Sequence, residues 1–262
     1  MRRREFLVVT LAGCVAHMAR GLANAEPARR HVPYMVDVGL LYNALGLRLS
    51  GSATETIDRE AGHYSVTMIG EGAGLASRLE SRGFLRAGRW VPSETVSWFD
   101  VKGRQARSTV QYDHDRRTIE IHARSETFFL RRQRVLDDVI PLPDAAPVDD
   151  VVSALLNYAD GRWPAGPDGA LRTLVVRRRR SEHEGPDDVQ GVYRAELTPL
   201  VLHMGSDPTT GNATATFDLA PFSSWAREGR PAIVAFGSDR RPERINCSMI
   251  LGTSLAIRFD VA

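Results

Sequence analysis

Residues 32–39 read VPYMVDVG, and this stretch decides the fold class. Its apolar residues recur at every second position, as Val32, Tyr34, Val36 and Val38. Because successive side chains of a β-strand point to opposite faces of a sheet, this spacing predicts a strand with one buried face. The stretch therefore favours a protein built on β-sheet.

The same alternation recurs along the rest of the chain, with turn residues at short spacing. Further strands are expected at 46–57, 63–70, 95–101, 107–113, 117–125, 170–180, 189–203, 213–220, 231–238, 244–250 and 253–261. Gly103 is the expected turn of a hairpin. About a dozen strands without a longer sequence repeat predict a mainly β fold. We expect antiparallel curved sheets in a barrel-like or sandwich architecture.

One segment departs from this pattern. Residues at about 150–160 show apolar side chains at helical spacing, and Asp149 or Asp150 can cap the start. The predicted buried stripe, expected to cover the concave side of the sheet, is Val151, Val152, Leu155 and Leu156. Residues 72–81, GAGLASRLES, suggest a second and shorter helix.

The chain after residue 25 has the length of one domain. We expect residues 26–262 to form a single β-rich domain, with the alternative of two halves joined at about 137–150, where a proline-rich connection precedes the helix. Cys247 is then the only remaining cysteine, so no disulfide within the chain is expected.

Residues 1–25 have the composition of an export signal, with a basic start and a short apolar run. Arg3 and Arg4, followed by Phe6 and Leu7, resemble the twin-arginine motif that directs folded proteins across the membrane. An ordinary secretion signal with an extra arginine is the alternative. The apolar run is shorter than the roughly 20 residues of a spanning helix. The export machinery is therefore an expected partner, and no transmembrane helix is expected in the mature chain.

This segment contains two alternative processing sites. Ala23 and Ala25 supply the small-x-small pattern that signal peptidase accepts, which predicts Glu26 as the mature N-terminus. Cys14 follows Leu-Ala-Gly and could instead receive a lipid. We expect a periplasmic protein, with a lipid-anchored envelope protein attached through Cys14 as the alternative.

Loss of this segment changes the charge. Residues 1–25 carry four arginines against one glutamate, so the net charge falls from +2 for the whole chain to −1 for the mature chain. The sequence pI of about 8.7 thus depends on the signal segment. It implies no nucleic-acid partner.

The mature chain shows no recognisable catalytic motif. Nucleophile elbows, phosphate loops and dinucleotide fingerprints are missing from the sequence. His114 lies between Asp113 and Asp115, but three adjacent turn residues point in different directions, so a turn explains them better than a metal site does. We therefore expect no catalytic residues, no cofactor and no metal, and we do not expect an enzyme.

Four consecutive arginines at 177–180 are the most unusual chemical feature. Guanidinium groups pair with phosphate or carboxylate, so an anion site is one hypothesis, with lipid headgroups as candidate ligands. The other hypothesis, which we favour, is a hairpin whose arginines pair with the acidic stretch at 182–188.

Short motifs in the chain resemble those of an exported bacterial family known as domain of unknown function 3108. They are DVVS at 150–153, SDRRPERI at 238–245, and a hairpin with Trp90 and Pro92. The resemblance implies export and a β-rich fold, and the family has no assigned catalytic residues. Its curved sheets are similar to those of envelope carriers that hold lipids or lipoproteins, such as proteins of the Lol pathway.

These observations lead to a functional hypothesis. The chain is expected to be an exported, non-catalytic protein that binds an apolar or amphipathic envelope component, with a lipid or lipoprotein as candidate ligand, between the curved sheet and the helix. A protein–protein interaction or scaffold module of the envelope is the alternative. An undetected envelope hydrolase is less favoured.

Overall fold

The computed structural model describes residues 27–40, 45–101, 103–127, 130–144, 146–163, 165–181, 187–189, 191–223, 226–249 and 252–260. The export motif Arg3, Arg4, Phe6 and Leu7, the cleavage site at Ala23 and Ala25, and the alternative lipidation site Cys14 lie outside these residues.

The described chain is mainly β, as the alternation predicts. Its strands are β1 (Ala28–Leu40), β2 (Leu45–Asp58), β3 (His63–Gly72), β4 (Leu75–Arg86), β5 (Arg89–Val101), β6 (Arg104–Asp113), β7 (Thr118–Glu126), β8 (Gln133–Pro141), β9 (Val148–Asp149), β10 (Leu171–Arg178), β11 (Ala195–Ser206), β12 (Ala213–Phe217), β13 (Ala232–Phe236), β14 (Pro242–Ser248) and β15 (Ser254–Phe259). One helix, α2 (Val151–Ala159), lies between β9 and β10 in the chain.

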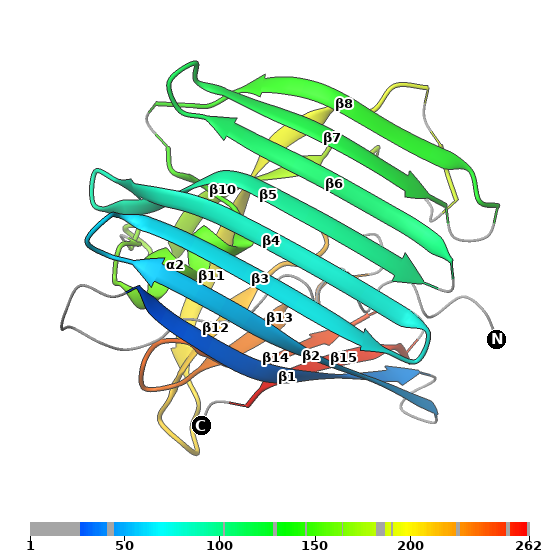
Figure 1. The fold of residues 1–262 in the computed structure, drawn as a ribbon. Helices are drawn as coiled ribbons and strands as arrows, with labels where there is room; N and C mark the ends of the chain where they lie inside the picture. The colour runs from blue at the N-terminus through cyan, green and yellow to red at the C-terminus, as the bar shows by residue number, and fades with distance from the viewer. Residues whose placement is uncertain are drawn as a thin grey trace.

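All fifteen strands belong to one sheet in the order β8-β7-β6-β5-β4-β3-β2-β1-β15-β14-β13-β12-β11-β10-β9. Every neighbouring pair is antiparallel except β9 and β10. The pairing of β1 with β15 joins the first and last strands of the described chain. Figure 1 shows β1–β8 as a broad curved layer, with the C-terminal strands and α2 behind it.

The main core lies between these layers. The predicted face of β1 is buried, because Val32, Tyr34, Val36 and Val38 are all at most 4% exposed. Val36 is opposite Ile257 of β15, which is also fully buried. Alternation in both strands thus places their apolar side chains on the same inner face.

Two glycines make room for a buried tyrosine in this core. Tyr34 is opposite Gly51, and Gly51 is opposite Gly70 on the next strand. A Cβ atom at Gly51 would lie 2.4 Å from Cζ of Tyr34, and one at Gly70 would lie 2.5 Å from its hydroxyl oxygen. The tyrosine ring therefore lies across the two glycines, and burial raises its pKa to about 12.

The segment 72–81, expected as a short helix, is part of β4 instead. Gly74 has φ of +77° and forms the turn from β3, and β4 then alternates buried and exposed residues. The helix expectation is wrong because Leu75 and Leu79, four residues apart, share a face in either structure. The backbone of this segment pairs with β3 and β5, and these pairings make it a strand.

Helix α2 begins as predicted, with Asp150 as its N-cap in a capping box with Ser153. The predicted buried stripe of the helix is only partly correct. Val152 and Leu156 are buried, but Val151 and Leu155 are only half-buried. The remaining buried residues of the helix are Ser153, Ala154, Asn157 and Tyr158. The helix is enclosed on most sides, so polar residues are buried with the apolar ones, and its buried apolar residues belong to the main core.

The curved sheet turns round until strands near its two ends meet. The Asp138 carboxylate of β8 accepts hydrogen bonds from the Ala195 backbone N–H, at 2.8 Å, and from Arg194, at 3.1 Å. A second apolar cluster lies behind this contact and consists of Tyr112, Ile119, Ile121, Leu136, Leu142, Val148, Tyr193 and Ala195. The fold is therefore barrel-like. No helix of the described segments is long and apolar enough to cross a bilayer.

Candidate functional site: an arginine hollow on the surface

Buried polar groups surround the start of α2. Asp149 is 1% exposed and forms an ion pair with Arg89 at 2.8 Å. Its carboxylate also accepts hydrogen bonds from Thr173 at 2.5 Å and from Asn157 at 2.9 Å. Burial raises the pKa of Asp149, and the guanidinium of Arg89 opposes this shift. These contacts join β5, β10 and α2.

The neighbouring Asp150 makes a similar set of contacts. It accepts hydrogen bonds from Ser81 of β4, from Thr95 of β5 at 2.6 Å, and from the Ser153 backbone N–H at 2.7 Å. The DVVS motif at 150–153 therefore forms a helix cap inside the protein. The polar atoms of this cap form hydrogen bonds with each other and with Ser81 and Thr95. Its role is to position α2.

A second buried ion pair lies at the other end of the helix. Arg241 and Glu55 approach within 3.7 Å, and their side chains are 2% and 3% exposed. Burial lowers the pKa of Arg241 to about 9, although Glu55 opposes this. The adjacent Arg240 lies over the ring of Tyr158 of α2, 4.6 Å from its centroid. Residues of the 238–245 motif thus hold the C-terminal end of the helix.

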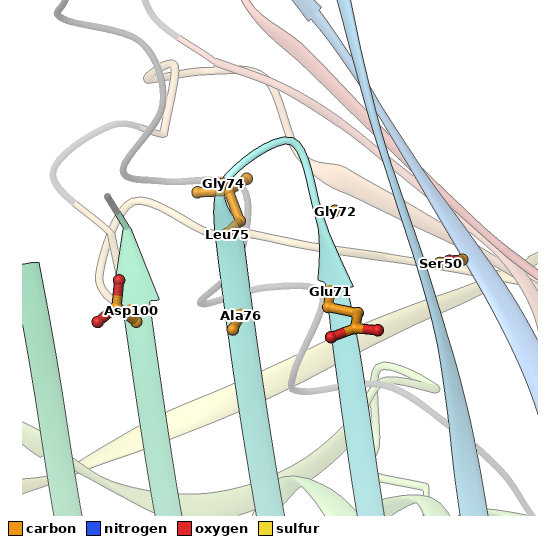
Figure 2. A pocket seen from close by; sticks show the side chains of 7 residues that line it. All are labelled: Ser50, Glu71, Gly72, Gly74, Leu75, Ala76 and Asp100. Atoms are coloured by element: carbon orange, nitrogen blue, oxygen red, sulfur yellow. The ribbon is translucent and has the colours of Figure 1, made fainter. Parts of the chain in front are cut away.

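A first surface hollow, of about 590 Å³, lies at the ends of β2–β5. It is lined by Ser50, Glu71, Gly72, Gly74, Leu75, Ala76 and Asp100. Figure 2 shows Glu71 and Asp100 on strands either side of Ala76. Two strand spacings, roughly 10 Å, separate the backbones of Glu71 and Asp100. Asp100 accepts a hydrogen bond from the Gly103 N–H in the next turn.

A second hollow, of about 290 Å³, lies where β10 ends and β11 begins. It is lined by Arg179, Arg180, Ser181, Val192 and Arg194. A backbone hydrogen bond of 2.7 Å from the Arg179 N–H to the Arg194 carbonyl holds the two segments together. We call these five residues the arginine hollow.

The arginine run contacts the paired strand β11. Glu196 of β11 forms ion pairs with Arg177 and, at 3.5 Å, with Arg179. Arg178 lies over the ring of Tyr193. Glu196, on the paired strand, is therefore one carboxylate partner of the run, and the pairing expected with the acidic stretch stays a prediction. Residues 182–186 of the acidic stretch lie outside the described chain.

Asp187 and Asp188 of that stretch also contact Leu130, between β7 and β8, and Arg134 of β8. Asp187 accepts a hydrogen bond from the Leu130 N–H, and the Asp188 carbonyl accepts from Arg134. The Tyr193 hydroxyl also reaches the Asp188 carbonyl, at 3.4 Å. These contacts bring Leu130 and the segments 187–189 and 192–194 into one surface region.

His114, singled out from the sequence, has a structural partner, and so does His122. His114 approaches the Pro92 carbonyl at 2.8 Å, while Asp113 accepts from turn amides. On the outer face of β7, His122 lies between Asp137 and Glu120, which raise its pKa. Among the described residues, no group of three or more histidine, cysteine or acidic side chains is placed to hold a metal.

Sequence reasoning identified Arg177–Arg180 but missed Val192 and Arg194, which complete the arginine hollow. They are distant from the run in sequence, and only the pairing of β10 with β11 brings them beside it. It also missed both buried ion pairs. Cys247 is buried, and burial raises the pKa of its thiol to about 12.

The fold and the hollow define a mainly β, barrel-like protein with a basic surface site. A structural comparison finds a likeness to the crystal structure of a beta-barrel-like protein of domain of unknown function DUF1849 from Brucella abortus. The TM-score is 0.38 at 7% identity, over 89% of this chain and 95% of that one. No protein-family model and no curated protein matches the chain. The structural likeness is thus to a different domain of unknown function from 3108.

Proposed function

We propose that the chain is an exported, non-catalytic binding protein of the bacterial cell envelope that holds an amphipathic, anionic component at the arginine hollow. Membership of the 3108 family is part of this proposal and rests on the motifs at 150–153 and 238–245. The ligand site lies on the surface in this proposal, in place of the site expected between the sheet and the helix, where Val152, Leu156 and Tyr158 of α2 belong to the main apolar core.

One observation carries the proposal: apolar side chains are exposed beside guanidinium groups. Val192 is 68% exposed within the arginine hollow. Val189 and Leu130 are also exposed, and the contacts of Asp187 and Asp188 hold them in the same region. An amphipathic molecule could place its charged group against the arginines and its apolar part against these side chains.

The proposal predicts binding of the purified mature chain to anionic vesicles. Val192→Asp is expected to reduce the bound fraction several-fold, because it places a carboxylate at the apolar contact. Vesicle flotation with and without phosphatidylglycerol measures this. Ile69→Asp is the matched control, since Ile69 on β3 is also exposed but does not line the hollow. Equal losses for both variants would contradict the proposed site.

Export is a separate part of the proposal and has its own test. Replacing Arg3 and Arg4 together with lysine is expected to abolish export, because the twin-arginine route requires the arginine pair. Cell fractionation and N-terminal sequencing should place the wild-type protein in the periplasm, beginning at Glu26. Unchanged export of the variant would indicate the general secretion route, and an acylated Cys14 would indicate a lipid anchor.

The scaffold alternative has an observation of its own. Strand β8 lies at one end of the sheet order and exposes Val135 and Val139 on one face. Apolar side chains exposed on a sheet face can pack against a partner protein. Val139→Arg would weaken such an assembly but leave vesicle binding unchanged, so flotation together with sedimentation analysis distinguishes the two functions.

A further inference from the structure

We infer that the outer face of β4–β7 carries a second binding site, which takes a short acidic saccharide. The site consists of Arg78, Trp98, Arg107 and Arg124, which we call the arginine–tryptophan row. It goes beyond the proposed function, because it shares no residue with the arginine hollow. A sugar ring lies against Trp98 in this inference, and a carboxylate of the saccharide pairs with Arg107.

Strand register places the four side chains of the row in one line. Arg78 of β4 is opposite Trp98 of β5. Trp98 is in turn opposite Arg107 of β6, and Arg107 is opposite Arg124 of β7. Phe99, the next residue after Trp98, is buried, so the row lies on the other, outer face of the sheet. This is the face of β4–β7 turned away from α2 and the C-terminal strands in Figure 1.

The charges of the row leave one cation for a ligand. Arg78 forms an ion pair with Glu80, and Arg124 forms one with Asp137 at 2.7 Å. Among the described residues no carboxylate pairs with Arg107, which lies opposite a second guanidinium group. Like charges directly opposite each other on neighbouring strands repel. An anion bound at Arg107 would relieve this repulsion.

Trp98 supplies the contact for a sugar ring. It is half-buried, so part of its indole is exposed between Arg78 and Arg107. The C–H groups on one face of a sugar ring pack well against the electron-rich face of an indole. The indole Nε1–H is buried, and it has no hydrogen-bond partner in the described part of the chain, which costs stability. The unpaired donor and the facing arginines occur on adjacent strands, which is expected at a functional site and not on a face selected for stability.

The surroundings of the row favour a saccharide over a nucleic acid. The carboxylates of Glu80 and Asp137 lie beside the row and would repel a chain with a phosphate on every unit. They can accept hydrogen bonds from sugar hydroxyls, as can the amide of Gln105, whose oxygen lies 3.4 Å from a guanidinium nitrogen of Arg107. The row extends over three strand spacings, roughly 14 Å, which is longer than one sugar ring. A short saccharide with carboxylates on its rings therefore suits both the length and the charge of the row.

The test uses the purified mature chain and one saccharide in two forms. Trigalacturonic acid is the acidic probe, and its fully methyl-esterified form is the neutral probe. Calorimetry measures the dissociation constant of each, and tryptophan fluorescence reports contact with the indole. We expect the acid to bind about tenfold more tightly than the ester, because the ester cannot form the charge-assisted pair with Arg107.

Two substitutions separate the roles of the row. Arg107→Gln should weaken binding of the acid about tenfold and leave binding of the ester unchanged. Trp98→Ala should weaken binding of both probes about tenfold and remove the fluorescence change. If Trp98→Ala does not fold, Trp98→Phe decides, since it keeps an aromatic ring and should still lose the fluorescence change. A fluorescence change that persists in the variant that is tested would overturn the inference.

Arg244→Gln is the matched control. Arg244 of β14 is also exposed and lies opposite an arginine, Arg258, but its other cross-strand neighbour is Ala235. The substitution should leave binding of both probes unchanged. Equal losses for Arg107→Gln and Arg244→Gln would overturn the inference, as would failure of the wild-type chain to bind the acid more tightly than the ester.

The remaining outcomes separate the inference from its alternatives. A short single-stranded oligothymidine that binds more tightly than trigalacturonic acid would assign the row to nucleic acid and overturn the saccharide site. Val192→Asp should reduce vesicle binding but leave binding of trigalacturonic acid unchanged, because Val192 lies in the arginine hollow. The saccharide site and the proposed function can therefore each fail without the other.

Discussion

Replacing Glu55 with glutamine is expected to lower the free energy of unfolding by about 3–5 kcal/mol. The reason is that Arg241, 2% exposed, would keep its positive charge in the interior without the carboxylate that lies 3.7 Å away. Chemical denaturation of the purified mature chain measures the loss.

A paired replacement tests the cause. Glu55→Leu combined with Arg241→Met removes both charges and is expected to recover most of the stability, because apolar side chains of similar size can replace a buried ion pair. Arg78→Gln is the control, since it breaks the exposed pair with Glu80 and should cost less than about 1 kcal/mol. If the double variant were as unstable as the single one, the positive charge of Arg241 would not be the cause.

Asp149→Ala is expected to have an effect of similar size, about 3–5 kcal/mol. The substitution leaves Arg89 without its ion-pair partner and removes the acceptor of hydrogen bonds from Thr173 and Asn157. These donors hold β5, β10 and α2 together, so the helix should loosen before the outer strands. Hydrogen exchange of the α2 amides, together with denaturation, measures both effects.

The control for this experiment is Asp168→Ala, which removes an exposed carboxylate that pairs with Arg172 four residues away. Because that pair lies in solvent, its loss should leave the α2 amides protected and the melting temperature nearly unchanged. Rapid exchange in α2 confined to Asp149→Ala would identify the buried network as the anchor of the helix. Equal exchange in both variants would contradict that role.

The candidate site could be predicted only in part. The run at 177–180 can be recognised from its four consecutive arginines, and an anion site was one of its two interpretations. Its pairing could not be read in the same way, because Glu196 reaches Arg177 and Arg179 only through the register of β10 with β11. Val192 and Arg194 carry no local signal that would separate them from any exposed residues near a strand end.

The amino-acid sequence alone determined the β character of the chain and the position of its helix. Val32, Tyr34, Val36 and Val38 share a face in any strand, and Asp150 with Ser153 can cap a helix through contacts three residues apart. Such signals depend only on residues that are close together in the sequence, so they can be recognised without knowing the fold. Where one spacing suits both structures, as at Leu75 and Leu79, the local signal failed.

Tertiary structure alone decided which residues meet inside the protein. Strand β1 pairs with β15 from the far end of the chain, and β8 meets β11 through Asp138. Alternation in β2 places Glu55 on the same buried face as Ala53 and Ile57, but only the tertiary structure brings Arg241 within 3.7 Å of it. The physical reason is that a buried charge is tolerated only where a partner from another strand reaches it, and that partner is set by strand order and register, which no local pattern encodes.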